Sequence, residues 1–108
     1  MDETIQPHAH FTTICREIQA ERALQDAQWG GAAHDDTHDP ASWCDFIEHQ
    51  IHRAAATVSD RPTWTADDLR LLRQRLIKIA ALGIAGVQSI DRELVRRQYP
   101  LIEVASDG

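Results

Sequence analysis

The most regular pattern of apolar residues lies in the last third of the chain. Between residues 65 and 98 apolar positions recur at steps of three and four, which is the spacing of one face of an α-helix. This seam comprises Leu69, Leu72, Leu76, Ile79, Gly83, Val87, Ile90 and Leu94. Thr65, with Asp68 three residues later, resembles a capping box and predicts where the helix starts. We expect the helix to continue to about Gln98, just before Pro100.

Two earlier segments also have helical spacing. The first is expected to start at Thr12 or Thr13 and to run to about Gln28. Trp29-Gly30-Gly31 should end it, because glycine accepts a left-handed backbone at the C-terminal flank of a helix. The second is expected to begin with Asp39 as its cap and Pro40 in its first turn, and to run to about Val58. Its expected buried face comprises Trp43, Phe46, Ile47, Ile51, Ala54, Ala55 and Val58.

These patterns predict an all-α fold, with three main helices in a bundle and a long C-terminal helix. Residues 11–98 form the expected single helical domain, residues 1–10 a flexible N-terminal arm and residues 99–108 a C-terminal tail. The last helix carries a second apolar set (Leu71, Ala81, Leu82, Ile84 and Ala85), and one short bundle cannot cover both sets. We therefore expect a homodimer joined through this helix. Gly83 and Gly86 interrupt the seam, either for close helix packing or to leave room for a ligand.

Composition narrows the function classes. The chain has 108 residues and a net charge of −6, from 17 acidic and 11 basic residues. This balance argues against non-specific DNA binding, which needs a cationic face. Cys15 and Cys44 show no metal-type spacing, and we expect buried free thiols in a reducing cytoplasm. With neither a signal segment nor an apolar run of about 18 residues, the sequence predicts a cytoplasmic protein without a membrane span.

Residues 34–39 (HDDTHD) concentrate possible metal ligands. Asp35 and Asp36 are hard oxygen ligands that suit Mg²⁺ or Mn²⁺, and His34 or His38 could act as a ligand or a base. The alternative is an ordinary solvated loop in which Asp39 caps the next helix. Glu21 stands four residues after Glu17, a spacing that allows a shared cation but is also typical of a solvated face.

Polar residues at otherwise apolar positions suggest a site for a phosphorylated ligand. In the first helix the apolar stripe fades after Ile18, and Arg22 and Gln25 take inward positions. On the last helix Lys78 and Arg92 could hold a phosphate, and Asp91 could complete a metal site. The alternative for these residues is a solvent face. Trp29 could stack on a base or pack at the hinge between helices.

Taken together, these residues resemble a group of small phage and prophage proteins. The shared pattern has three parts. The first is Glu21-Arg22 with Gln25, and the second is Trp29 followed by His34-Asp35-Asp36 and His38. The third is residues 75–82 followed by Asp91-Arg92. The resemblance covers about residues 17–93. If the chain is of this kind, its location is the cytoplasm of the host cell.

A looser similarity is to the all-α nucleotide pyrophosphohydrolases of the MazG type. Such proteins are dimeric helical bundles that cleave nucleoside triphosphates. Their Glu and Asp residues hold the Mg²⁺ ions that the reaction needs. Here Glu17 and Glu21 match only approximately, and no ExxD pattern follows on the middle helix.

The resulting hypothesis is a metal-dependent nucleotide phosphohydrolase with Mg²⁺ or Mn²⁺ as cofactor. Glu21, Asp35, Asp36 and Asp91 would hold the metal, and His34 or His38 would serve as base. Substrate would contact Arg22, Gln25, Trp29, Lys78 and Arg92. One alternative is a non-catalytic phage protein that sequesters a nucleotide signal or inhibits a host defence protein, and another is a purely structural or interaction bundle.

Overall fold

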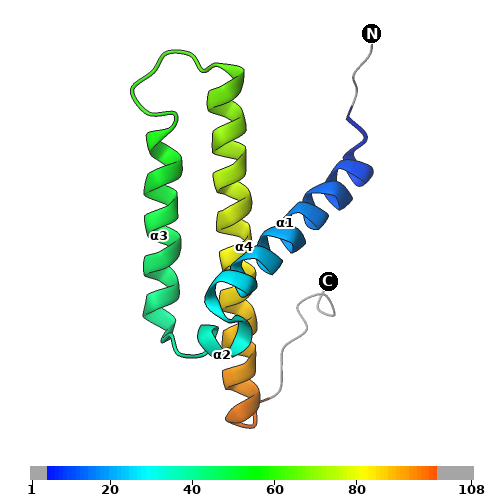
Figure 1. The fold of residues 1–108 in the computed structure, drawn as a ribbon, viewed down its shortest axis with the longest axis vertical. Coiled ribbons are helices and arrows are strands. Elements are labelled where there is room, and N and C mark those ends of the chain that lie inside the picture. Colours follow the sequence, from blue (N-terminus) through cyan, green and yellow to red (C-terminus); the bar gives the residue numbers. More distant parts are fainter. Residues whose placement is uncertain (1–4, 100–108) are drawn as a thin grey trace.

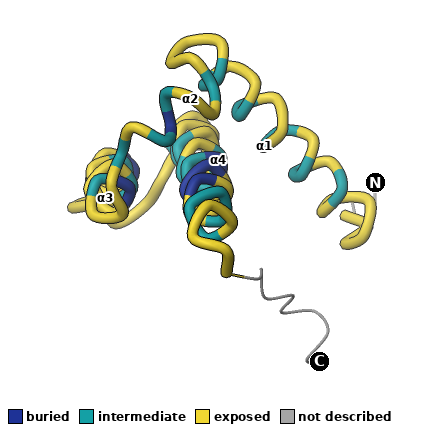
Figure 2. The backbone as a smooth tube through the Cα atoms, turned by 90° about the horizontal axis from the view of Figure 1, so that it is seen from below, coloured by how far each residue is buried: buried dark blue, intermediate teal, exposed yellow. Residues whose placement is uncertain are grey.

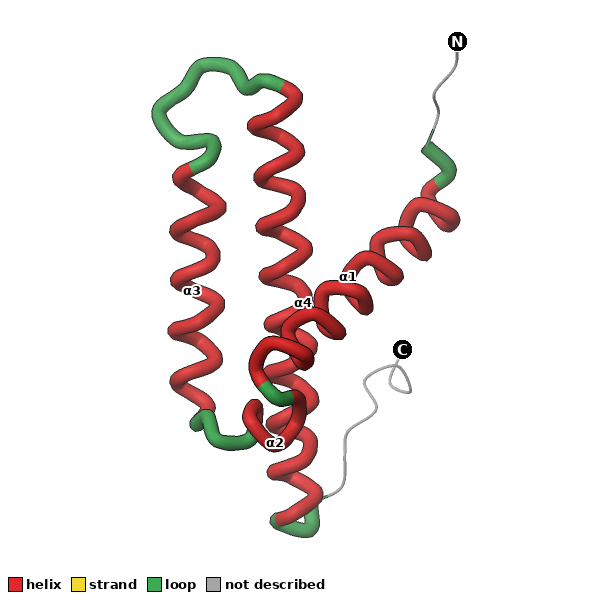
Figure 3. Tube along the Cα trace, in the orientation of Figure 1, coloured by secondary structure: helices red, strands yellow, loops and turns green. Residues whose placement is uncertain are grey.

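The computed structural model describes residues 5–99, and every regular element in this range is a helix. The elements are α1 (Pro7–Trp29), α2 (Gly31–Asp35), α3 (Pro40–Ala56) and α4 (Ala66–Arg96). Helices α3 and α4 form an antiparallel hairpin, and α1 crosses α4 and diverges from the hairpin toward its own N-terminus (Figure 1). The short helix α2 lies beside α4, between the ends of α1 and α3 (Figure 3). The predicted all-α fold and long C-terminal helix are confirmed, with α2 as an additional element.

Helix α1 starts earlier than the sequence pattern predicts. It begins at Pro7, so residues 7–10 of the expected arm are helical. Proline suits a first helical turn, because its missing N–H would have no partner there. The hydroxyls of Thr12 and Thr13 donate to the carbonyls of His8 (3.1 Å) and Ala9 (3.0 Å), as threonines inside a helix do, and neither residue is the cap.

The predicted caps of the other two long helices are confirmed. Asp39 precedes Pro40, and its Oδ1 accepts a hydrogen bond from the Ser42 N–H at 2.8 Å. The Thr65 hydroxyl accepts from the Asp68 N–H at 3.1 Å. The Asp68 carboxylate accepts in return from the Thr65 N–H at 2.9 Å, which completes the capping box.

Two consecutive glycines turn the chain between α1 and α2. Gly30 has φ of 107° and Gly31 has φ of 70°, both in the left-handed region where a side chain is strained. The Gly30 N–H donates to the Asp26 carbonyl at 2.9 Å and closes α1 as predicted. The chain then forms one further helical stretch instead of the expected loop, and this places His34 and Asp35 on α2.

The core uses a different face of α4 from the one that the apolar seam predicts. The buried residues of α4 are small: Ala81, Ala85, Gly86 and Ser89. Gly86 lets the ring of Trp43 come so close that a Cβ atom there would lie 3.4 Å from it. The seam residues Leu69, Leu76 and Val87 remain 51%, 53% and 60% exposed. Two residues of the second apolar set, Ala81 and Ala85, thus lie in the core of the chain, whereas much of the seam stays exposed.

On α3, the predicted buried face is only partly buried. Trp43 and Ala54 are buried, whereas Phe46 and Ile51 are exposed. The two cysteines are free, as predicted, but Cys44 is exposed and Cys15 half-buried. The prediction of two buried thiols is therefore wrong, because Cys44 lies on the outer side of α3.

The chain has an open shape with little buried surface. Its radius of gyration is 16.8 Å, whereas a compact domain of this length has about 13 Å. Helix α1 has no buried residue along its whole length (Figure 2). Among residues 5–99, no helix is both long and apolar enough to cross a membrane.

Candidate functional site

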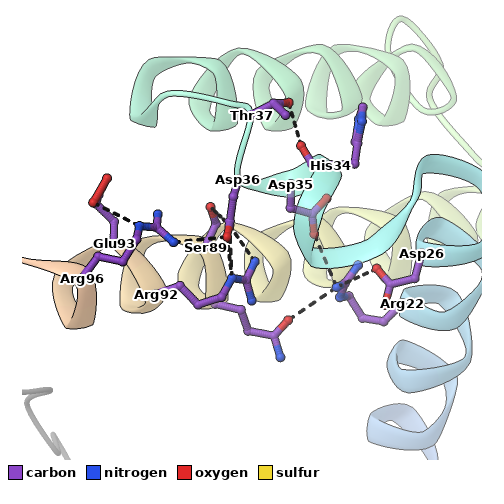
Figure 4. A network of polar contacts seen from close by, with 11 residues as sticks. Arg22, Asp26, His34, Asp35, Asp36, Thr37, Ser89, Arg92, Glu93 and Arg96 are labelled. Carbon is purple, nitrogen blue, oxygen red and sulfur yellow. Dashed lines mark hydrogen bonds and ion pairs between the residues drawn. The ribbon is translucent and has the colours of Figure 1, made fainter.

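Asp36, immediately after α2, is tied to α4 by several hydrogen bonds. The Arg92 Nε atom donates to both carboxylate oxygens (3.1 and 3.0 Å), and Arg92 Nη2 donates to Oδ1 at 2.9 Å. The Ser89 hydroxyl donates to Oδ1 at 2.9 Å, and Arg96 Nη1 approaches Oδ2 at 3.4 Å. Figure 4 shows this network, in which one carboxylate faces two guanidinium groups.

The charge of Asp36 is stabilised by these partners. Hydrogen bonding from Arg92 lowers the pKa of Asp36 to about 2, with Ser89 and Arg96 contributing in the same direction. Hydrogen bonding from Asp36 in turn raises the pKa of Arg92. Asp36 and Arg92 therefore neutralise each other, and their main role here is to fix α2 against α4.

Arg22 joins α1 to α2 and α4. Its Nη2 atom lies 3.0 Å from Asp26 Oδ1 and 3.7 Å from Asp35 Oδ2, and it donates to Gln88 at 3.4 Å. Arg22 Nη1 donates to Gln25 at 3.3 Å, and Gln25 donates to Glu21 at 3.4 Å. The predicted neighbours Glu21, Arg22 and Gln25 thus form one polar chain on α1.

Asp35 is the only buried acidic residue among the residues that the structure describes, with 8% exposure. Its Oδ2 atom has no hydrogen-bond partner, although Arg22 lies near enough for an ion pair. A buried carboxylate oxygen without a hydrogen bond is costly. This oxygen is therefore a natural acceptor for a ligand donor or a cation.

His34 and His38 come together in a group of aromatic rings. Their Nε2 atoms are 3.3 Å apart. Trp29 stacks on His34 with ring centroids 6.0 Å apart. The His38 ring lies edge to face with Trp43 and Phe46, at centroid distances of 5.6 and 4.8 Å. These contacts hold both imidazoles in place.

A cleft of about 600 Å³ opens beside this group, and all four helices line it. Its lining includes seven residues that the sequence singled out: Glu21, Gln25, Trp29, His34, Asp35, His38 and Lys78. Trp43, Phe46, His49, Gln50, Arg53 and Leu82 complete most of the wall. The volume falls in the range of small-molecule sites, about 300–1,000 Å³.

The four predicted metal ligands do not converge. Glu21 and Asp35 line the cleft, but Asp36 is bound by arginines, and Asp91 is not among the residues that line it. Asp91 is two residues from Ser89, so a helix directs the two side chains to nearly opposite sides. Within residues 5–99, no group of three His, Cys, Asp or Glu side chains is placed to hold a metal ion. Glu17, one helical turn before Glu21, is engaged by Arg73 of α4.

The predicted substrate-binding residues also divide into two groups. Gln25, Trp29 and Lys78 line the cleft, whereas Arg22 and Arg92 are engaged by carboxylates of the chain. Sequence reasoning missed His49, Gln50 and Arg53 of α3, which line the cleft. Their signal was present, since they lie three, four and seven residues after Phe46, on the same side of the helix.

A second hollow of about 430 Å³ shares His38 and Trp43 with the cleft and is otherwise lined mainly by the end of α4.

Comparison with known proteins gives no assignment: no family model, curated protein or solved structure matches this chain. The geometry of the cleft is therefore the basis for any functional proposal.

Proposed function

We propose that the chain binds a nucleotide in the cleft between its four helices. The observation that carries this proposal is the placement of cationic and aromatic side chains around one hollow of suitable size. Trp29, Trp43 and Phe46 supply ring faces or edges, and Arg53 and Lys78 supply positive charge. A nucleotide combines a flat apolar base with an anionic phosphate, so it needs both kinds of contact.

Lys78 and Arg53 are suited to the phosphate because both remain available. Neither forms a salt bridge with another residue in the part of the chain that the structure describes. Of the phosphate ligands that the sequence predicts, Lys78 is available, whereas Arg22 and Arg92 already face carboxylates. The phosphate contacts are therefore assigned to α3 and α4.

Trp29 is suited to the base. Its side chain is 55% exposed at the end of α1, and it stacks on His34 on one side. Gln50 and Asp35 each have a buried oxygen without a hydrogen-bond partner. Both oxygens are acceptors, so they favour a ligand that carries N–H donors, such as an amino-substituted base.

Calorimetric titration with nucleoside mono-, di- and triphosphates tests this proposal. We expect Lys78→Gln to weaken binding about tenfold or more, since it removes a charged hydrogen bond. Trp29→Ala should weaken binding by a similar factor. Arg70→Gln is the matched control for charge, because Arg70 pairs with Asp67 on the exposed surface of α4. No binding by any nucleotide, or equal binding by all variants, would contradict the proposal.

A second candidate function is metal-dependent cleavage of a nucleotide phosphoanhydride. The observation that favours it is that Glu21 and Asp35 line the same cleft as the proposed phosphate ligands. Mg²⁺ often binds through one or two carboxylates and takes its remaining ligands from substrate phosphates and water. In this hypothesis His34 or His38 would serve as the base. Asp36 and Asp91 have no part in it.

Chromatography of a nucleotide panel after incubation with the protein, with and without Mn²⁺ or Mg²⁺, separates binding from turnover. Hydrolysis predicts metal-dependent loss of a nucleotide, abolished in Glu21→Gln and retained in Asp91→Asn. An unchanged panel together with measurable nucleotide affinity would leave binding as the function.

We also propose that the protein is a homodimer joined through the exposed seam of α4. Leu69, Leu76 and Val87 lie on one side of α4 and are each more than half exposed. Helix α1 has no buried residue, which is unusual for a helix of 23 residues. A second copy of the chain would cover the seam with an equally apolar surface, as isologous dimers do.

A further inference from the structure

Two imidazole nitrogens beside the cleft have the spacing of two ligands on one metal ion. His34 Nε2 lies 3.3 Å from His38 Nε2, whereas the ring centroids are 4.9 Å apart. The rings therefore turn their Nε2 edges toward each other. Zn–N bonds of about 2.0–2.1 Å at a tetrahedral angle would place two nitrogens about 3.3–3.4 Å apart. The observed separation matches this geometry.

We propose that His34 and His38 together bind a divalent transition-metal ion of the zinc class through their Nε2 atoms. This inference goes beyond nucleotide binding, because the metal needs no nucleotide in order to bind. It also differs from a magnesium site, since imidazole nitrogen selects Zn²⁺, Co²⁺, Ni²⁺ or Cu²⁺ over hard cations.

The backbone holds this pair at the required spacing without a metal. The two residues are four apart, at the end of α2 and just after it. The Thr37 N–H and hydroxyl donate to the His34 carbonyl at 3.0 and 2.7 Å, and the His38 N–H donates to the Asp35 carbonyl at 3.2 Å. These i→i−3 bonds tighten the chain into a turn directly after α2, and this turn brings the His38 ring beside the His34 ring.

The ring packing fixes the side chains as well as the backbone. Trp29 stacks on the ring of His34, and Trp43 and Phe46 pack against the ring of His38. These contacts limit the rotation of both imidazoles, which reduces the cost of ordering the ligands on binding.

Groups of both charges lie around the two histidines, because Arg53 and Lys78 line the same cleft as two carboxylates. Glu21 and Asp35 line the same cleft as the two histidines, and the Asp35 Oδ2 atom has no hydrogen-bond partner. No third His, Cys, Asp or Glu among the described residues joins the pair within metal-binding distance. The remaining coordination positions are therefore open to water or to an anionic ligand.

The alternative is a direct hydrogen bond between the two rings. That bond needs a proton on one of the two Nε2 atoms, whereas metal binding needs both Nε2 atoms free of protons and both Nδ1 atoms protonated. The two arrangements differ in tautomer, so NMR of the imidazole nitrogens can distinguish them.

The test is titration of the whole chain with Zn²⁺ or Co²⁺ alone, followed by calorimetry and by long-range ¹H–¹⁵N NMR of the histidines. We expect one ion per chain and a shift of both Nε2 signals to those of metal-bound nitrogens. His34→Gln and His38→Gln should each weaken binding about tenfold or more, because each removes half of the protein ligands.

His52→Gln is the matched control. His52 also has a possible ligand four residues away, since its Nε2 lies 3.6 Å from Glu48 Oε1, but it lies on the exposed side of α3. This variant should keep the wild-type affinity. Weak binding spread over several histidines, equal affinity in all three variants, or unchanged His34 and His38 signals in the wild-type protein would each overturn the proposal. Nucleotide titration without metal is unaffected by these outcomes, so the two proposals can fail separately.

Discussion

The carboxylate of Asp36 is held by the guanidinium of Arg92 through bonds of 2.9–3.1 Å, which join the end of α2 to the last turns of α4. The two residues are 56 positions apart in the chain. This ion pair fixes α2 in place, and α2 carries His34 and Asp35 into the cleft. Asp36 thus positions the site without being part of its lining.

Acid should weaken this connection. Because the folded-state pKa of Asp36 is about 2 and its ordinary value is 3.8, the pair stabilises the fold above about pH 4. The stabilisation is lost as the pH falls through about 2, where the carboxylate becomes protonated in the folded protein. We expect Asp36→Asn to lower the urea midpoint at neutral pH and to flatten its pH dependence between about 4 and 2.

Asp45→Asn provides the control for this measurement, since Asp45 is exposed on α3 and forms no salt bridge within residues 5–99. Its midpoint should follow the wild-type curve. An Asp36→Asn curve that also follows the wild type would show that the ion pair contributes nothing to stability.

The position of each threonine in its helix predicts how much its replacement by alanine changes the free energy of unfolding. Thr65→Ala should lower the free energy of unfolding by about 1 kcal/mol, because it removes the side-chain acceptor of the capping box. Thr12→Ala and Thr13→Ala should change it by less than about 0.5 kcal/mol, since both lie inside α1. Urea unfolding of the three variants measures this difference. A cost of about 1 kcal/mol at Thr12 or Thr13 would instead favour a helix that starts there.

The ring of Trp43 on α3 packs against Gly86 of α4. Trp43 is 6% exposed, and we expect Trp43→Ala to cost about 3–5 kcal/mol by leaving a cavity. Trp43→Phe should cost less, because the buried indole N–H has no hydrogen-bond partner to lose.

Gly86 supplies an independent check of the same contact. A Cβ atom there would be in ordinary contact with the indole, so Gly86→Ala should be tolerated. Gly86→Leu should displace Trp43 and destabilise the protein by about 1–3 kcal/mol. Equal stability of the alanine and leucine variants would mean that the two helices do not pack as described.

The exposed seam of α4 predicts the oligomeric state. Sedimentation at micromolar concentration should give about twice the mass of one chain. Leu76→Asp and Val87→Asp should shift the protein toward monomer, because each places a charge in an apolar interface. Gln74→Asp changes a polar exposed position on the same helix and should leave the dimer intact. A wild-type monomer would refute the proposed interface.

The sequence predicted the parts of the fold that depend on local rules. The caps at Asp39 and Thr65 and the left-handed backbone at Gly30 follow from side-chain chemistry within a few residues. Helix α1 was predicted too short because its first turn is polar and exposed, and has no apolar period. Periodicity could not predict which side of α4 is buried, because that choice depends on how Trp43 fits against Gly86.

For the candidate site, the sequence predicted the segment but not the role of each residue. His34, Asp35 and Lys78 line one cleft, as a concentration of polar residues at unexpected positions suggested. Asp36 and Arg92 were predicted to bind a metal and a phosphate, yet they bind each other. Long-range pairing of opposite charges removes residues from a site, and no spacing in the sequence reveals it.

Helix α1 supplies Glu21, Gln25 and Trp29 to the cleft while burying none of its own residues. In an isolated chain, its amide protons should exchange with solvent sooner than those in the middle of α4, because little packing opposes local opening. One wall of the cleft is then the least stable part of the fold. A ligand that contacts this wall would slow amide exchange along α1 and leave the α3–α4 hairpin nearly unchanged, which would make the helix itself the reporter of occupancy.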